Sequence, residues 1–256
     1  MPIHLLALDT STDLLAAALL TVPPQPPDGS TAAPALACLN EAGGKQASSR
    51  LIPALMGLLA ASGLGLADLQ AIAFGQGPGA FTGLRTACAV AQGLALAHET
   101  PLLAIDSLLI VAEDARLQAG DWPAVAITAD CWVAMDARMD EVYAAAYWHG
   151  PEGWQVRVAP QLWTLPALAA AWTAAPPHRV AGTAITAFAD RLPWGTAQRF
   201  AECSNRAAAL ARLALAAWQQ GASIAPDQAL PLYLRDKVAL TTAERSQRKL
   251  AALPSP

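Results

Sequence analysis

Two segments of this chain, 127 residues apart, share one pattern. The sequence LALDTSTDLLAAAL begins at Leu6, and VAMDARMDEVYAAA begins at Val133. Each is a short apolar run that ends at an aspartate, Asp9 or Asp136, and is followed by a polar turn and a second apolar run. This pattern is typical of a strand, a tight turn and an antiparallel strand. Its repetition predicts two related lobes, each opening on a hairpin whose turn begins with aspartate.

The rest of the chain predicts a mixed α/β protein. The prolines of TVPPQPPDGSTAAPA exceed what a strand tolerates, so we expect a long, partly disordered tip on the first hairpin. Beyond it, helical and strand patterns alternate. We expect strands at 3–9, 14–20, 69–75 and 101–105, and helices at 48–62, from Thr82 as an N-cap to 97, and from about 107.

Composition and charge limit the function. A formal net charge of -4 argues against a protein that grips nucleic acid alone. The four cysteines form no CxxC pair, which is typical of reduced thiols, and the N-terminus has no basic secretory region. The uncharged run at 51–67 is interrupted by proline and glycine, so we expect a helix of a cytoplasmic protein and no membrane span.

A glycine-rich loop, GQGPGAFTG, starts at Gly75. It formally satisfies the dinucleotide fingerprint, which would indicate a dinucleotide-dependent oxidoreductase, but Pro78 removes one N–H donor and the following helix begins late. No GK[ST] follows the glycines, so a Walker A loop is excluded. The alternative is a tight loop that lets a helix approach a strand.

The two aspartates of the repeated turns allow two interpretations. Turns that face each other across a cleft can hold nucleotide phosphates, with Asp9 and Asp136 orienting a magnesium ion, as in a kinase or ATPase acting alone. Alternatively, both carboxylates cap their own turns. The four histidines are isolated in sequence, so no local H-x-x-x-H metal site can form.

Two helices are candidates for an interface. The expected helix at 48–62 has two apolar stripes side by side, which predicts burial on more than one side. The expected helix at 82–97 is built of small residues and has almost no polar face. Such helices are either central in their own lobe or covered by a partner protein.

Three segments resemble a known family. They are GQGPGAFTGLRTACAVAQGLA, MDARMDEVY and PLYLRDKVA, and the opening LLALDTST and the spacing between segments also fit. They are similar to the signature stretches of the bacterial tRNA threonylcarbamoyladenosine biosynthesis family TsaB, also called YeaZ. The motif G-P-G-[SA]-F-T-G-[LV]-R is specific, and the resemblance spans nearly the whole chain.

The resemblance implies a fold and a partner function. The fold is the two-lobed one shared by actin, sugar kinases and a class of heat-shock chaperones (the ASKHA fold), with lobes at 1–106 and 107–256 and a C-terminal helix that can pack back on the first lobe. The function is that of a non-catalytic scaffold for a TsaD-like transferase, which modifies the adenosine next to the anticodon. A TsaE-like ATPase and tRNA join through the complex, and the chain alone can form a homodimer.

The resemblance also assigns residues. The family's heterodimer is built from its first two long helices, which places the partner interface at Leu51, Leu55, Leu58, Arg85, Ala89, Gln92 and Gly93. We expect no catalytic residue, metal or cofactor of its own, with ATP, ADP and magnesium possible at the complex. Candidates for a nucleotide-facing role are Asp9, Thr10, Gly77, Gly79, Thr82, Asp136 and Arg138. The basic tail from 235 to 249 is expected to be solvated rather than a tRNA contact.

Overall fold

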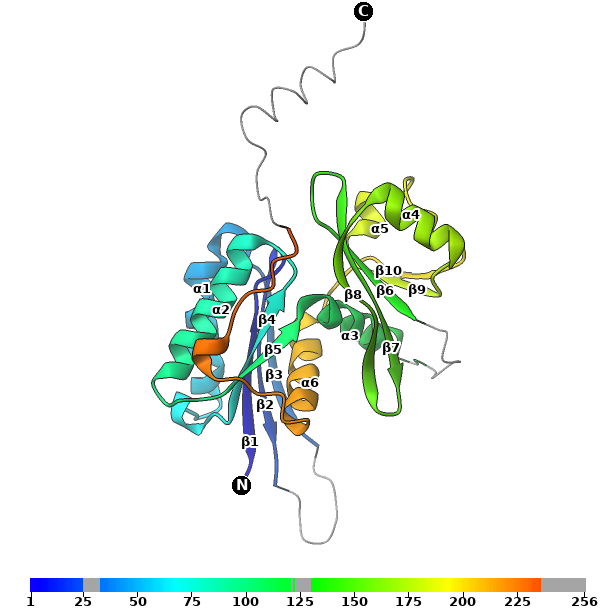
Figure 1. Cartoon of the computed structure of the whole chain (residues 1–256). Coiled ribbons are helices and arrows are strands. Elements are labelled where there is room, and N and C mark those ends of the chain that lie inside the picture. Colours follow the sequence, from blue (N-terminus) through cyan, green and yellow to red (C-terminus); the bar gives the residue numbers. More distant parts are fainter. Residues whose placement is uncertain (25–32, 121, 123–129, 236–256) are drawn as a thin grey trace, which may run out of the picture.

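The computed structural model describes residues 1–24, 33–120, 122 and 130–235, and among these the chain forms two five-stranded sheets (Figure 1). The first sheet has the order β3-β2-β1-β4-β5 and the second the order β10-β9-β6-β7-β8. The strands of the first are β1 Ile3–Asp9, β2 Leu14–Val22, β3 Ala35–Ala42, β4 Ala71–Gly77 and β5 Leu102–Asp106. Those of the second are β6 Cys131–Asp136, β7 Glu141–Gly150, β8 Gly153–Thr164, β9 Arg179–Ala181 and β10 Gln198–Phe200.

The two sheets have the same topology. In each, three antiparallel strands come first along the chain, and the first of them pairs in parallel with a strand that follows a helix. Asp9 ends β1 opposite Ala16, and Asp136 ends β6 opposite Val142, so the repeated aspartates hold equivalent positions. The predicted duplication and the mixed two-lobed fold are confirmed.

Helices cover both faces of the first sheet. α1 (Ala47–Ala61) and α2 (Phe81–Leu96) bury apolar side chains against one face. α3 (Ser107–Ala119) and α6 (Arg206–Gln219) cover the other face, where the alanines of α6 allow a close approach to β1 and β2. A helix from the C-terminal half of the chain therefore completes the first lobe.

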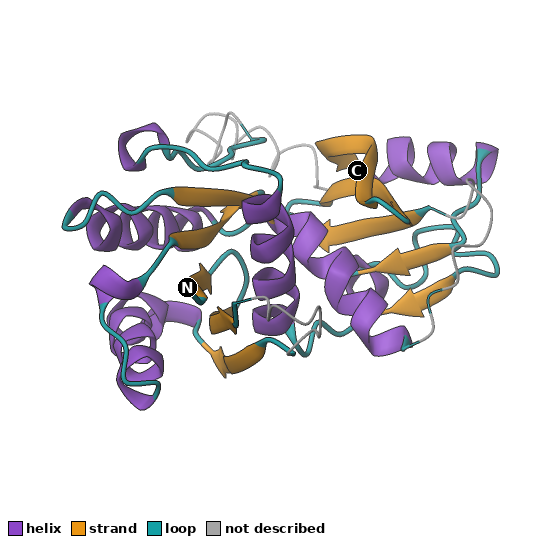
Figure 2. Ribbon diagram, turned by 90° about the horizontal axis from the view of Figure 1, so that it is seen from below, coloured by secondary structure: helices purple, strands orange, loops and turns teal. Residues whose placement is uncertain are grey.

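The second sheet is covered by α4 (Leu165–Ala174), by the short α5 (Ala184–Ala187), and on its other face by α3. α3 contacts both sheets, because Ile110 packs into the core of the first lobe and Val111 into that of the second. Figure 2 shows helices between the two groups of strands. The predicted division at residue 106 falls at the start of α3, and it stays a prediction.

The C-terminal part of the described chain adds a long extended segment. We call residues 224–235 the C-terminal strap; it includes the 3-10 turn η3 (Pro226–Gln228), while η1 (Gly44–Gln46) and η2 (Leu66–Asp68) lie elsewhere. Ile224 exchanges two backbone hydrogen bonds with Leu102, and the Leu232 amide donates to Gln76. The strap therefore runs along the first lobe beside α2, where Figure 1 shows it in orange and red.

Several local predictions need correction. Thr82 is not the N-cap of α2, because Ala80 precedes the first turn and no side chain caps it. The two apolar stripes predicted on α1 are not both buried: Leu51 and Leu55 of the first are buried, whereas Ile52 and Met56 of the second are 45% and 41% exposed. Leu59, the third member of the second stripe, is buried. The strand β3 was not predicted. The predicted hairpin tip lies largely outside the described residues.

None of the helices in the described ranges combines the length and apolar character that a membrane span requires.

Candidate functional site

The turn between β1 and β2 is closed by a buried ion pair. Asp9 is fully buried, and its Oδ2 accepts from Nη2 of Arg206 at 2.5 Å and from Nε at 3.2 Å. Ser11 donates to Asp9 from its hydroxyl at 3.0 Å and from its backbone amide at 3.2 Å. Asp9 is thus engaged by an arginine of α6 and by its own turn, and its carboxylate is buried; the nucleotide-facing role of Asp9 stays a prediction.

The glycine loop packs directly on this turn. A Cβ added to Gly75 would overlap the Asp9 carboxylate, and one added to Gly83 would overlap the carbonyl oxygen of Thr10. Thr10 is 1% exposed, and its hydroxyl donates to the backbone carbonyl of Gly83 at 2.7 Å. The loop therefore acts as the close approach between a helix and a turn, which was the structural alternative drawn from the sequence.

The other predicted loop residues have different positions. Gly77 donates its backbone amide to the Ser107 hydroxyl at 3.0 Å, and Gly79 packs against Ser11. Thr82 is exposed in the first turn of α2, where its carbonyl accepts from Thr86. Of these three residues, only Gly79 lines the cleft described below.

The turn between β6 and β7 has a left-handed backbone. Arg138, Met139 and Asp140 all have positive φ angles, of 65°, 59° and 61°. Asp136 accepts from the Arg138 amide at 2.7 Å and from its guanidinium at 3.3 Å, so this carboxylate caps its own turn. Left-handed conformations of non-glycine residues persist only where surrounding contacts hold them.

Those contacts come from Arg235 of the C-terminal strap. Its Nη2 donates to the carbonyls of Ala137 and Arg138 at 3.0 and 3.3 Å, and to Glu141 Oε2 at 2.5 Å. The strap thereby connects the first lobe to the second. Arg235 was expected to be part of a solvated tail, and this expectation is wrong for Arg235; residues 236–249 of that tail lie outside the described residues.

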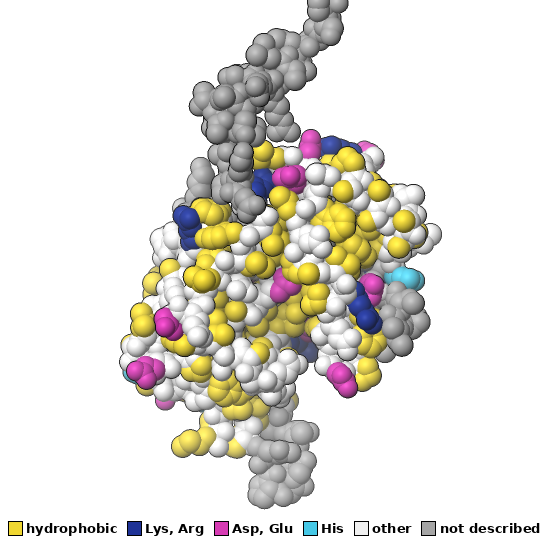
Figure 3. Space-filling view, viewed as in Figure 1, with side chains coloured by type: hydrophobic (Ala, Val, Ile, Leu, Met, Phe, Trp, Pro, Cys, Tyr) yellow, Lys and Arg dark blue, Asp and Glu magenta, His cyan; other side chains and the backbone are white. Residues whose placement is uncertain are grey.

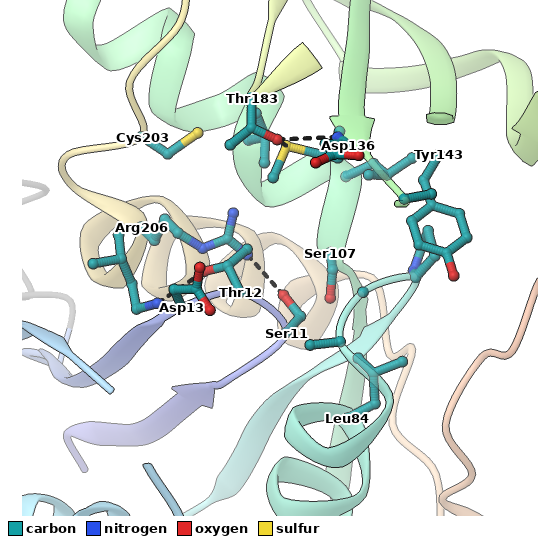
Figure 4. Close-up of a pocket in the computed structure, with 18 of the residues that line it drawn as sticks. Ser11, Thr12, Asp13, Leu84, Ser107, Asp136, Tyr143, Thr183, Cys203 and Arg206 are labelled. Carbon is teal, nitrogen blue, oxygen red and sulfur yellow. Dashed lines mark hydrogen bonds between the residues drawn. The ribbon is translucent and has the colours of Figure 1, made fainter. Parts of the chain in front are cut away.

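A cleft of about 980 Å³ lies between the lobes. The two turns, the glycine loop, α3, the start of α6 and the end of the strap all line it. Figure 3 shows hydrophobic atoms, with acidic side chains among them, in the hollow between the lobes. Figure 4 shows Ser11, Thr12, Ser107, Thr183 and Arg206 around it. Asp136 and Arg138 line the cleft, whereas Asp9 and Thr10 do not.

A second polar contact, between Asp106 and Tyr147, joins the lobes. Asp106 caps α3 by accepting from the Leu108 amide at 2.9 Å, and Tyr147 of the second sheet donates its hydroxyl to the same carboxyl group. Burial raises the pKa of Asp106 to about 6, although these hydrogen bonds oppose the rise. The proton of Asp106 is thus sensitive to mildly acidic pH.

The predicted interface residues divide into two groups. Leu51 and Leu55 are fully buried against the first sheet, so they contact no partner directly in this arrangement. Leu58 is partly buried, while Ala89 and Gly93 are exposed on α2. Ala89 has only a methyl side chain and Gly93 has none, so this part of the α2 surface is exposed and flat.

Arg85 and Gln92 hold the strap. The Arg85 guanidinium stacks over Phe81, 3.8 Å from the ring centroid, and donates to Tyr233 at 3.0 Å. Gln92 donates to the carbonyls of Pro226 and Ala229 at 2.9 and 3.2 Å. Both were predicted to contact a partner, and both have partners within the chain.

No group of three or more metal-ligating side chains comes together within the described ranges. The four cysteines are free thiols. Burial raises the pKa of Cys203, which lines the cleft beside Arg206, and the nearby guanidinium opposes that rise.

Comparison with known proteins identifies the family. Residues 39–164 match the family model described as "TsaD: tRNA N6-adenosine threonylcarbamoyltransferase". The chain is 36% identical over 156 residues to the tRNA threonylcarbamoyladenosine biosynthesis protein TsaB of Escherichia coli, which covers 58% of this chain and 60% of that protein. With TsaB of Haemophilus influenzae it is 38% identical over 140 residues, 54% of this chain and 51% of that protein. These two alignments therefore span about half to three fifths of the curated relatives.

The solved structure described as YeaZ from Pseudomonas aeruginosa is 34% identical, with a TM-score of 0.75, and the match covers 91% of this chain and 100% of that one. A second Pseudomonas aeruginosa structure, of a protein described as similar to peptidase YeaZ, is 35% identical with a TM-score of 0.76 and the same coverage. The chain belongs to the TsaB/YeaZ family.

The residues that sequence reasoning missed are Arg206 and the strap. Arg206 is the first residue of RAAALARLALAAW, so a charged side chain begins a largely apolar helix. This position was the only feature of the sequence that could have indicated a role for Arg206. The strap segment carries no helical or strand periodicity, so its contacts with α2 could not be read from its pattern. In this chain, residues 231–235 of the PLYLRDKVA stretch thus join the two lobes.

Proposed function

We propose that this chain is a non-catalytic partner subunit of the tRNA threonylcarbamoyladenosine modification complex. Its partner is a TsaD-like transferase, which modifies the adenosine next to the anticodon. The observation that carries this proposal is membership of the TsaB/YeaZ family, together with an apolar outer face on α1 and α2.

The outer face of α1 and α2 suits a helix-on-helix interface. Ile52 and Met56 of α1 are 45% and 41% exposed, although both are large and apolar. Ala89 of α2 has only a methyl side chain and Gly93 has none, which allows another helix to approach closely. A face of this kind is stabilised when a partner removes it from water.

The state of the two aspartates supports an accessory role. Asp9 is neutralised by Arg206, and Asp136 accepts from its own turn, so neither carboxylate is poised to orient a magnesium nucleotide. The competing proposal, a kinase or ATPase acting alone, draws on no specific observation of the described residues. We therefore assign any ATP, ADP or magnesium that acts in the reaction to the complex, which a TsaE-like ATPase and tRNA join.

Native mass spectrometry of the chain co-expressed with the TsaD-like subunit of the same genome tests this proposal. We expect a defined heterodimer, which grows when ATP and a TsaE-like protein are added. If the chain stays apart from that subunit and instead retains a magnesium nucleotide, the partner proposal fails. The chain alone, measured at the same concentrations, reports on the homodimer.

Charge substitutions locate the interface. Met56→Arg or Ala89→Arg places a charge in the outer face, and we expect either to weaken the heterodimer by about tenfold or more, because the guanidinium would be buried without a partner. Ala170→Arg is the matched control, since Ala170 is an exposed alanine on a helix of the second lobe. Equal affinity of Ala89→Arg and Ala170→Arg would contradict this interface.

A further inference from the structure

The floor of the inter-lobe cleft contains a buried donor that the fold does not use. Arg206 is fully buried, and its Nε and Nη2 donate to Asp9 and Ser11. Its Nη1 has no hydrogen-bond partner among the residues that the structure describes. In Figure 4 this nitrogen points away from Ser11 toward the space below Cys203 and Thr183. An unpaired N–H of a buried guanidinium is unfavourable, so this position attracts an acceptor oxygen.

The N-terminus of α6 lies at the same end of the cleft. Arg206 is the first residue of this 14-residue helix, whose first turn has no acidic residue and whose N-cap, Asn205, makes no side-chain capping bond. The partial positive charge of a helix N-terminus adds to that of the guanidinium. Both observations favour an oxyanion at this end of the cleft.

The surrounding charges limit how much negative charge a ligand can carry. Asp13, Glu41, Asp136 and Glu202 line the cleft, and Asp9 already balances the charge of Arg206. The other two arginines of the lining are engaged, Arg138 with Asp136 and Arg235 with Glu141. A polyphosphate would be repelled by these carboxylates, whereas a singly charged group is compatible with one free donor.

The opposite side of the cleft is apolar. Phe81 and Leu84 of α2, Val111 of α3, Tyr143 of β7 and Leu232 of the strap line it. A cleft of about 980 Å³ is large enough for a small molecule, and its apolar wall suits a hydrocarbon or aromatic body.

We propose that the inter-lobe cleft binds a small molecule that carries one carboxylate beside an apolar body, with the carboxylate received by Nη1 of Arg206. This site is separate from the outer face of α1 and α2. It therefore stands or falls independently of the partner proposal.

The natural thiol of Cys203 provides a test on the unmodified chain. Cys203 lines the cleft, whereas Cys38 is exposed on β3 outside it. Cys38 therefore serves as an internal control for the reactivity of Cys203. Hexanoate, benzoate and 4-phenylbutyrate, supplied at millimolar concentration, are expected to slow alkylation of Cys203 and to leave that of Cys38 unchanged. Mass spectrometry of the two peptides gives both rates.

Matched compounds separate a carboxylate site from an apolar pocket or a simple anion site. We expect the primary amides of the three acids to bind about tenfold or more weakly by calorimetry, because the charge-assisted hydrogen bond to Nη1 is lost. Inorganic phosphate alone is expected to give no protection. Equal binding of acids and amides, protection by phosphate alone, or no protection by any of the three acids would each overturn the proposal.

Two variants test the assignment to Arg206. Arg206→Lys keeps a cation beside Asp9 but removes the free Nη1, so a folded Arg206→Lys protein should bind acids and amides equally. If that variant does not fold, Cys203→Phe fills the space next to Nη1 and should abolish binding, while Cys38→Phe should leave it intact. Retained carboxylate selectivity in the folded Arg206→Lys protein, or in Cys203→Phe, would contradict the assignment.

Discussion

At the scale of single residues, the turn that starts at Asp9 is held by contacts that leave no spare volume. Arg206 and Ser11 satisfy its carboxylate, while Gly75 and Gly83 let the glycine loop lie directly against it. The conformational freedom of glycine matters less here than its missing side chain. Two substitutions in α2 separate these effects.

Gly83→Ala should lower the free energy of unfolding by about 1–3 kcal/mol, because the added methyl group would overlap the Thr10 carbonyl. Gly93→Ala, in the same helix, meets no atom within 4 Å and should raise stability by about 0.5–1 kcal/mol, as expected for alanine in a helix interior. Urea unfolding followed by circular dichroism measures both. Similar effects of the two substitutions would contradict the tight contact.

Asp106 makes stability depend on pH. Its pKa is raised to about 6 in the folded chain, so the folded state binds more protons than the unfolded state between the ordinary value of 3.8 and about 6. Stability should therefore fall as pH rises through this range, by about 3 kcal/mol in total. Asp106→Asn, whose amide can still pair with Tyr147, should lose this part of the slope. The assignment to Asp106 would be contradicted if the unfolding free energy of Asp106→Asn changed between pH 4 and pH 7 by as much as that of the unsubstituted chain.

At the scale of elements, the C-terminal strap holds α2 on one side and the left-handed turn of the second lobe on the other. Its contacts use Gln92, Arg85 and Arg235, which come from different parts of the sequence. The repeated hairpins were predictable because alternating apolar residues and a second copy of the pattern were visible in the sequence. β3 and the strap were not, because β3 is largely surface-exposed and the strap has no regular period.

Arg235→Ala should loosen both ends of this connection. We expect a loss of about 1.5–3 kcal/mol, since the guanidinium is mostly buried and pairs with Glu141 and two carbonyls. Hydrogen exchange should increase in residues 224–235 and also at 137–141. The exposed Arg199 of β10 provides a control, and Arg199→Ala should change neither segment. Faster exchange in only one of the two segments would show that Arg235 does not join them.

At the scale of the whole molecule, two lobes of the same topology share α3 and differ in the other helices that cover their sheets: α1, α2 and α6 in the first lobe, α4 and α5 in the second. The duplication and the mixed α/β class followed from the sequence, and the family resemblance predicted the two-lobed arrangement. The site was less predictable, because the Asp9 carboxylate is paired with the Arg206 guanidinium, and nothing local in the sequence links these two residues. The family resemblance placed Leu51 and Leu55 at an interface, and the apolar stripe that contains them could not show that this side of the helix faces the core.

The first lobe should not fold without the C-terminal half. A fragment of residues 1–119 lacks α6, so Leu5, Ala7 and Ala18 would lose the helix that covers their face of the sheet. We expect such a fragment to lack a cooperative unfolding transition in calorimetry. Addition of residues 130–235 as a separate chain should restore it, and a cooperative transition of the fragment alone would contradict this view.

The pairing of Asp9 with Arg206 bears on how the protein is made. The two residues are 197 positions apart, so the first hairpin leaves the ribosome long before the arginine that neutralises its buried carboxylate. Until then, that carboxylate stays hydrated and the sheet face beneath it is open to water and to other chains. Synthesis of the last fifth of the chain is therefore the step that closes the protein, and a nascent chain stalled before residue 206 is a natural substrate for chaperones.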